Sequence, residues 1–192
     1  MMNCKLRIVL ASNSPRRREL LSGLSLEYEV RVMKGIDESY PDTLSAEEIP
    51  VYISQKKAEA YSLAEDELLI TADTIVWLDG YVLGKPHDRE EAVEMLRSLS
   101  GKTHQVITGV TMRSIQMTHS FHSVSDVTFA RLSDEEIAYY VDNYKPFDKA
   151  GAYGIQEWIG YIGVSGLRGS YFNVMGLPIQ RLYTELKNLS VI

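Results

Sequence analysis

The sequence has little of several features that would assign it to common protein classes. Cys4 is its single cysteine, so no disulfide can form within the chain, and we expect a reduced, cytoplasmic compartment. No apolar run approaches the roughly 18 residues that a membrane-spanning helix needs, so we expect no membrane partner. The first apolar segment is short, and arginines follow where a signal-peptide cleavage site would lie, which is atypical of a secreted protein.

Basic residues are also scarce. Lysine and arginine total 20 against 26 aspartates and glutamates, which gives a formal net charge of −6. Nucleic acids need a broad basic surface, so we expect no nucleic-acid partner. Positive charge is nevertheless gathered at three adjacent arginines, Arg16, Arg17 and Arg18. This triplet suits a small polyanion, although alone it is more typical of a solvated first turn of a helix.

The usual signatures of several enzyme classes are absent as well. No pair among His87, His104, His119 and His122 has zinc-ligand spacing with a supporting Cys or Glu, so we expect no zinc site. The G-x-S-x-G motif of many serine hydrolases does not occur. Cys4 has no evident activating partner, so a nucleophilic cysteine is not expected.

The composition is that of an ordinary globular protein, with 45% hydrophobic and 24% charged residues among 192. This length suits one domain, or two small lobes that share a core. No repeat, low-complexity tract or linker marks a boundary, so we interpret residues 1–192 as a single domain. Strands and helices alternate along the chain, which predicts an α/β fold with a mixed sheet.

The expected elements follow from hydrophobic periodicity and from turn and cap signals. Strands are expected over residues 7–11, 27–33, 68–72, 103–113 and 119–131. Residues 74–78 are expected either to continue the third of these strands or to pair with it, and a hairpin turn is expected at 79–80 into 81–85. Helices are expected to begin near Arg16, at Ser45 or Pro50, at Asp88, at Ser133 and at Pro178. Short strands are expected across the glycine-rich stretch 148–176.

The segment 12–21, S-N-S-P-R-R-R-E-L-L, leaves a strand, turns, and enters a helix. Helix N-termini present unpaired N–H groups and the positive end of a dipole, so they bind anions. Ser12 and Ser14 add hydroxyl groups, and Arg16 and Arg17 add forked guanidinium donors that suit phosphate oxygens. The segment therefore predicts a phosphate cradle without Walker glycines; a Ser-Pro turn that only caps the helix is the alternative.

Acidic residues supply a second set of candidates. Asp73 ends an apolar strand, where α/β proteins usually carry their chemistry, and it could bind Mg²⁺ or activate a water, or only cap a turn. Asp37 and Glu38 could help to hold a divalent cation, although adjacent acids are also common in surface loops. The lysines that could neutralise part of a triphosphate, each more typical of solvent exposure when taken singly, are Lys57, Lys85 and Lys149.

Six sequence blocks occur in order between residues 8 and 189: S-N-S-P-R-R-R-E-L-L, A-D-T-I-V, G-K-P-x-D, L-S-G-K-T-H-Q-V, D-K-A-G-A-Y-G-I-Q and G-S-Y-F-N-V-M-G-L-P. Together they resemble the Maf family of nucleoside triphosphate pyrophosphatases. The resemblance implies a Maf/Ham1-like fold related to the inosine triphosphatases: a mixed, strongly bent sheet flanked by helices, with two lobes around a central cleft. It also implies that water attacks the α-phosphorus of a nucleoside triphosphate, with Mg²⁺ or Mn²⁺ required, and releases the monophosphate and pyrophosphate.

The block at 148–156 resembles the branch of the family that acts on dTTP and UTP, modified pyrimidine nucleotides included. By matched position, the resemblance implies that Asp73 is the proton acceptor and holds the metal together with Glu38. The positions that it associates with substrate choice are Arg16, Thr74 and Gln156, and those on the phosphate side or in the cleft are Ser12, Arg17, Lys57, Lys85 and Lys149. The Gln156 amide can both donate and accept, so it can pair with the O4/N3–H edge of thymine and uracil.

Two residues depart from the family pattern. Glu157 stands where the family usually has glycine, and Arg168 precedes G-S-Y where another residue is more common, so both can alter the wall around the base. The alternative functions are a 7-methyl-GTP pyrophosphatase of the same family and a non-catalytic nucleotide-binding regulator of cell division. A homodimer is a reasonable expectation for a small metabolic enzyme.

Overall fold

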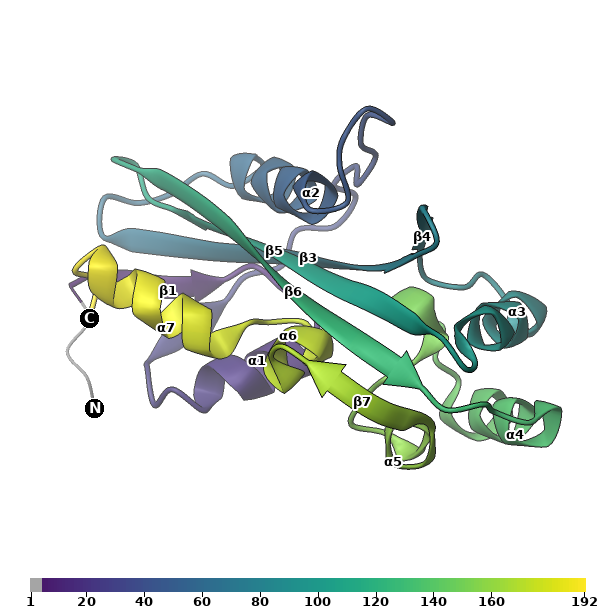
Figure 1. Ribbon diagram of the computed structural model, residues 1–192. Coiled ribbons are helices and arrows are strands. Elements are labelled where there is room, and N and C mark those ends of the chain that lie inside the picture. The colour runs from purple at the N-terminus through teal and green to yellow at the C-terminus, as the bar shows by residue number, and fades with distance from the viewer. Residues whose placement is uncertain (1–4) are drawn as a thin grey trace. The chain divides into compact units, whose positions relative to one another are not determined.

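A computed structural model describes residues 5–192. Its seven-stranded sheet has the order β2-β1-β3-β5-β6-β7, with β4 paired to β3, and helices flank the sheet (Figure 1). The predicted α/β class with a mixed sheet is thereby confirmed. Cys4, for which neither a disulfide nor a nucleophilic role was expected, lies outside the described residues.

The strands of the sheet are β1 (Arg7–Leu10), β2 (Tyr28–Val30), β3 (Glu67–Leu78), β4 (Tyr81–Leu83), β5 (Thr103–Arg113), β6 (Thr118–Phe129) and β7 (Val164–Arg168). The helices are α1 (Pro15–Ser22), α2 (Glu48–Glu59), α3 (Arg89–Leu99), α4 (Asp134–Tyr144), α5 (Trp158–Gly163), α6 (Tyr171–Met175) and α7 (Ile179–Asn188), with a 3₁₀ turn at Ala150–Ala152. Strand β1 pairs in parallel with β2 and β3, whereas β4 and β7 pair antiparallel with their neighbours β3 and β6.

The helix starts predicted from cap signals at Asp88 and Ser133 are confirmed. The start expected at Ser45 or Pro50 lies between them, because α2 begins at Glu48 with Glu47 as an N-cap that makes no side-chain bond. Ser14, Asp88 and Ser133 each accept a backbone N–H of the following first turn, and Ser133 forms the predicted capping box with Glu136. These caps are found in the sequence because donor and acceptor lie within three residues of each other. Among residues 5–192, no helix has the length and apolar character that crossing a bilayer requires.

Three expectations about secondary structure were wrong. Asp73 was expected at the end of a strand, but it lies within β3 because the strand continues through the residues that follow it. The strand expected over 27–33 is only Tyr28–Val30 long, and the stretch 148–176 contains helices α5 and α6 and the 3₁₀ turn besides the single strand β7. Gly160 of α5 packs tightly on the turn that precedes the helix, because a Cβ at this position would lie 1.8 Å from the Ile155 carbonyl oxygen. The glycine thus permits a close helical approach rather than breaking the structure into short strands.

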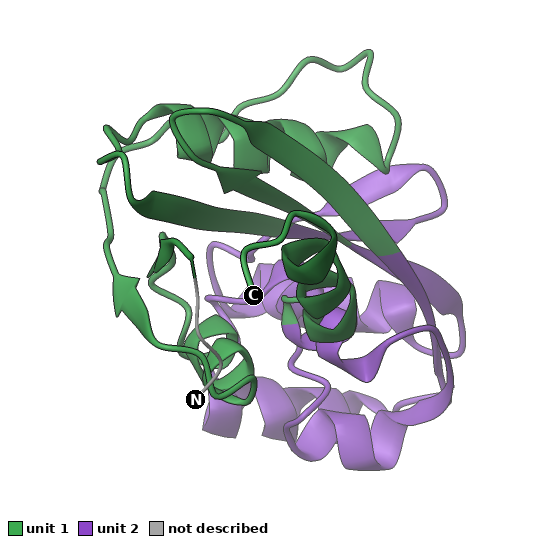
Figure 2. Ribbon diagram, turned by 90° about the vertical axis from the view of Figure 1, so that its left-hand side faces the viewer, with its two compact units in different colours: residues 1–73, 108–123, 176–192 green, residues 74–107, 124–175 purple. Residues whose placement is uncertain are grey.

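The chain divides into two compact units, coloured separately in Figure 2. Unit 1 comprises Met1–Asp73, Thr108–Ser123 and Gly176–Ile192, and unit 2 comprises Thr74–Ile107 and Val124–Met175. Strands β3, β5 and β6 each contribute residues to both units. The predicted site residues are therefore divided between them.

In unit 1, helix α2 covers one face of the sheet, with α1 and α7 on the other (Figure 1). The core under α2 includes Val9, Ala58, Tyr61 and Leu69. Side chains alternate along a strand, so Thr71 and Asp73 share the face of Leu69. The Thr71 hydroxyl donates to the Ser54 carbonyl of α2 at 2.7 Å. Because Asp73 lies on the same face of β3, its side chain faces the C-terminal part of α2, where Lys57 is located.

The core of unit 2 contains a cluster of three buried rings, His104, Phe129 and Tyr153, with centroids 5.0 to 5.4 Å apart. The Nε2 atom of His104 lies 2.7 Å from the Tyr153 hydroxyl. Burial lowers the pKa of His104 from 6.5 to about 4. The imidazole is therefore neutral in the folded protein at physiological pH.

This burial predicts an acid-sensitive stability. We expect the free energy of unfolding to fall between pH 6.5 and pH 4, because the unfolded chain binds a proton at His104 that the folded protein excludes. The contribution of the group approaches about 3 kcal/mol at the acid end of this range. Urea unfolding of the wild type and of His104→Gln at several pH values in this range measures the contribution of His104 to the free energy of unfolding. Equal pH slopes for the two proteins would contradict the assignment.

Candidate active site

The turn from β1 into α1 is built by hydroxyl caps. Ser14 is the N-cap of α1 and accepts the Arg17 backbone N–H at 3.4 Å, with Pro15 in the first helical position. The Ser12 hydroxyl accepts the backbone N–H of Ser14 at 3.2 Å and is almost fully buried. The capping interpretation of the Ser-Pro turn therefore holds for Ser14, and Ser12 shapes the same turn from inside.

Arg17 points into unit 1. Its Nε donates to the Gly176 carbonyl at 2.7 Å, and its Nη1 donates to the Ala72 carbonyl at 2.8 Å. Burial lowers the pKa of Arg17, and the nearby Asp73 and Glu38 carboxylates act in the opposite direction. Arg17 therefore anchors the backbone that precedes Asp73 and also brings positive charge close to that residue.

The three arginines do not form the solvated helix turn that the triplet alone favours. Arg18 donates to the Ser12 carbonyl at 3.4 Å and to Asn13 Oδ1 at 3.1 Å. Arg16 is half-buried and close enough to Arg17 to lower its pKa electrostatically. The N-terminal end of α1 thus carries a concentrated positive field, as an anion site requires.

A charged cluster joins α2, β3 and the loop after β2. The Lys57 ammonium lies 2.8 Å from Asp73 Oδ1 and 3.0 Å from Glu38 Oε1. Asp73 and Glu38 therefore converge on one cation position, taken here by Lys57. Asp37 belongs to a different contact, because it pairs with Lys56 at 2.9 Å. The two adjacent acids are thus divided between two lysines.

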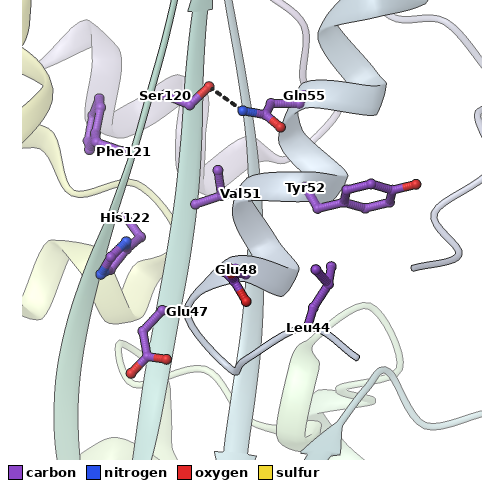
Figure 3. A pocket seen from close by; sticks show the side chains of 9 residues that line it. All are labelled: Leu44, Glu47, Glu48, Val51, Tyr52, Gln55, Ser120, Phe121 and His122. Atoms are coloured by element: carbon purple, nitrogen blue, oxygen red, sulfur yellow. Dashed lines mark hydrogen bonds between the residues drawn. The ribbon is translucent and has the colours of Figure 1, made fainter. Parts of the chain in front are cut away.

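A pocket of about 340 Å³ lies against α2 in unit 1 (Figure 3). Its lining residues are Leu44, Glu47, Glu48, Val51, Tyr52, Gln55, Ser120, Phe121 and His122. Gln55 donates to the Ser120 hydroxyl at 3.1 Å within it. Lys57 follows Gln55 by two positions, about 200° around the helix. The pocket and the Asp73 cluster therefore lie on different faces of α2.

In unit 2, three side chains converge around Gly154. A Cβ there would lie 3.0 Å from Gln156 Nε2, 3.0 Å from Glu157 Cδ and 3.1 Å from Lys149 Cε. Lys149 is buried, with its ammonium 2.7 Å from Asp148 and 3.1 Å from Glu157. The Gln156 Oε1 atom is buried and accepts no hydrogen bond from the described residues. That carbonyl oxygen is an acceptor available to a ligand N–H group.

Unit 2 also contains Thr74, Lys85 and Arg168, which the sequence analysis singled out. Lys85 is exposed and follows Gly84, whose carbonyl accepts the Gly151 N–H at 3.0 Å. Thr74 is half-buried on β3, and strand alternation turns it to the face opposite that of Asp73. Arg168 is an exposed side chain on β7 that pairs with Asp126.

Tyr140 lies on the buried face of α4, together with Ile137 and Val141. The structure gives it a polar role, because its hydroxyl donates to Glu157 Oε2 and accepts the Gly154 N–H at 3.0 Å. A signal was present: a fully buried tyrosine at a helix position where leucine would pack equally well implies a partner for its hydroxyl. That partner could not be named without the fold, because it lies 17 residues away.

Known proteins resemble this chain in sequence and in fold. A family model described as Maf-like protein matches residues 7–189. A dTTP/UTP pyrophosphatase of Phocaeicola vulgatus is 67% identical over 187 residues, covering 96% of this chain and 97% of that protein. A dTTP/UTP pyrophosphatase of Bacteroides thetaiotaomicron is 64% identical with the same coverage. The structure of the Staphylococcus aureus Ham1 protein covers 95% of this chain and 98% of that chain, with 19% identity and a TM-score of 0.52. The predicted Ham1-like fold is thereby confirmed.

Proposed function

The chain belongs to the Maf family, and from this premise we propose that it hydrolyses dTTP and UTP at the α-phosphorus, releasing the monophosphate and pyrophosphate. Two relatives of 67% and 64% identity that carry this activity in their names support the proposal. The structural observation that carries it is the convergence of Asp73 and Glu38 on one cation position near Arg17. A triphosphate needs such a pairing of acidic metal ligands with basic groups.

In the proposed mechanism Asp73 orients the attacking water and accepts its proton. Lys57 donates to one oxygen of this carboxylate at 2.8 Å and holds its orientation. Arg17 fixes the preceding backbone through the Ala72 carbonyl, so the carboxylate is positioned from two sides. Arg16 and the N-terminal end of α1 contribute positive charge for the phosphates. No covalent intermediate is needed.

The residues also fit a divalent cation. Asp73 and Glu38 offer oxygen ligands that already face a common positive charge, which is the donor type that Mg²⁺ and Mn²⁺ prefer. Within residues 5–192 no group of three or more His, Cys, Asp or Glu side chains converges, so phosphate oxygens and water would complete the coordination. When bound, the cation supplies positive charge that polarises the phosphate oxygens.

Base selection is assigned to Gln156. Its unpartnered Oε1 can accept the N3–H of uracil or thymine, while its amide nitrogen can donate to O4. Both nucleotides share this edge, which accounts for a dual preference. The sugar plays no part in this contact, so the assignment tolerates both ribose and deoxyribose.

The proposal is tested by pyrophosphate release from dTTP, UTP, CTP, GTP, ITP and 7-methyl-GTP with Mg²⁺ or Mn²⁺, each product being identified by chromatography. We expect monophosphate formation from dTTP and UTP to exceed that from the others. Preference for 7-methyl-GTP would overturn the choice of substrate but keep the reaction. Nucleotide binding without turnover of any of them would favour a regulatory binding protein instead.

A further inference from the structure

Glu157, which departs from the family pattern, closes a turn centred on Gln156. The Glu157 N–H donates to the Gly154 carbonyl at 3.0 Å, so residues 154–157 form one tight turn with Gln156 at its third position. Glu157 is also the N-cap of α5. The proposed base-reading side chain is therefore carried on a four-residue turn with a carboxylate at its end.

Both ends of this turn are tied to a single buried hydroxyl. Tyr140 Oη accepts the Gly154 N–H at 3.0 Å and donates to Glu157 Oε2. Burial and the bond to Glu157 raise the pKa of Tyr140 above its usual value, so the hydroxyl keeps the proton that it donates. Lys149 binds the second carboxylate oxygen at 3.1 Å. Each oxygen of the Glu157 carboxylate therefore has its own partner, and the two contacts together fix the position of the group.

The fixed position of the Glu157 carboxylate affects which base can form hydrogen bonds with the Gln156 amide. Rotation of a glutamine amide by half a turn exchanges donor and acceptor, and cytosine presents the pattern opposite to that of uracil. An amide that rotates freely would pair with either base. Discrimination therefore requires a group that prefers one orientation of the amide.

Glu157 lies close enough to the Gln156 amide to favour one of its two orientations. The Gln156 Nε2 atom and the Glu157 Cδ atom both lie 3.0 Å from the point where a Gly154 Cβ would stand, so they are at most 6.0 Å apart. A carboxylate at this distance favours the orientation in which the NH₂ end of the amide faces it. The Oε1 atom then remains as the acceptor, and this buried atom has no hydrogen-bond partner among the described residues.

We infer that Glu157, held by Tyr140 and Lys149, is a positioning residue that fixes the Gln156 amide as an acceptor for N3–H and so excludes cytosine nucleotides. This inference rests on the proposed function. It assigns Glu157 no contact with the reacting phosphate, so its effect falls on base preference rather than on the chemical step.

The test compares kcat/KM for UTP and CTP in the wild type and in Glu157→Gln and Tyr140→Phe. We expect the UTP-to-CTP ratio to fall roughly tenfold in both variants, through KM more than kcat. Matched controls are Glu94→Gln on α3 and Tyr139→Phe, both at exposed positions of unit 2, which should keep the wild-type ratio. In a Gln156→Ala background, Glu157→Gln should change the ratio no further, because its effect acts through that amide.

The outcomes separate this inference from the proposed function. An unchanged ratio in Glu157→Gln and Tyr140→Phe, with normal turnover of UTP by the wild type, overturns the inference alone. A wild type that releases no pyrophosphate overturns the proposed function. Amide hydrogen exchange at Gly154 in Tyr140→Phe gives a second readout that does not depend on turnover. Faster exchange than in Tyr139→Phe supports the anchoring of the turn, and equal exchange overturns it.

Discussion

Replacing Asp73 by asparagine is expected to lower pyrophosphate release from dTTP and UTP by roughly 10²- to 10⁴-fold, the range that a positioned general base contributes. Asparagine keeps the size of the side chain but cannot take a proton from water. Lys57 keeps its contact with Glu38 at 3.0 Å, so the local fold should survive. Steady-state rates and the melting temperature of the variant measure the two effects separately.

The matched control is Asp79→Asn, which removes an exposed carboxylate paired with Lys102 at the β3–β4 turn. Exposed ion pairs contribute little to stability, so this variant should retain both rate and fold. A near-normal rate in Asp73→Asn would sink the assignment of Asp73 as proton acceptor. Loss of rate accompanied by a collapsed melting curve would instead assign Asp73 a structural role.

The largest effect on stability is expected at Gly109 of β5. A Cβ at this position would lie 2.3 Å from Pro50 C and 2.3 Å from Val51 N, both backbone atoms of α2. Neither atom can rotate away, so Gly109→Ala must push the helix off the sheet. We expect a loss of about 3 kcal/mol or more in the free energy of unfolding, measured by urea denaturation.

Gly166→Ala on β7 is the matched control for this substitution. Its Cβ would meet Thr128 at 3.4 Å, an ordinary van der Waals distance, so the change in stability should be small. Similar losses in the free energy of unfolding for the two variants would show that replacing any strand glycine is destabilising, and that the contact with α2 is not the cause. Because α2 carries Lys57, a soluble Gly109→Ala protein should also lose activity.

The parts of the fold that depend on local signals could be predicted from the sequence. The Ser133–Glu136 capping box and the Asp88 cap lie within one turn of the helices that they start, so no long-range information is needed. The stretch 148–176 could not be predicted in this way. Its helix α5 depends on how closely Gly160 approaches the Ile155 carbonyl, and a glycine-rich sequence alone does not distinguish such an approach from a turn.

In the candidate site, too, some features could be predicted from the sequence and others depend on the fold. The arginine triplet, Asp73 and Gln156 stand out in the sequence because of their residue types and the motifs around them. The contact of Lys57 with both Asp73 and Glu38 joins residues 16 and 19 positions apart. The parallel pairing of β1 with β2 and β3, together with the packing of α2 on β3, brings their elements together. The homodimer and the cytoplasmic compartment stay predictions.

The position of bond cleavage tests the central claim most directly. UTP is hydrolysed in water enriched in oxygen-18, and the released monophosphate and pyrophosphate are analysed by mass spectrometry. Attack on the α-phosphorus places the label in the monophosphate and leaves the pyrophosphate unlabelled, which is the result that we predict. Label in the pyrophosphate, or release of UDP and labelled phosphate, would contradict the proposed reaction.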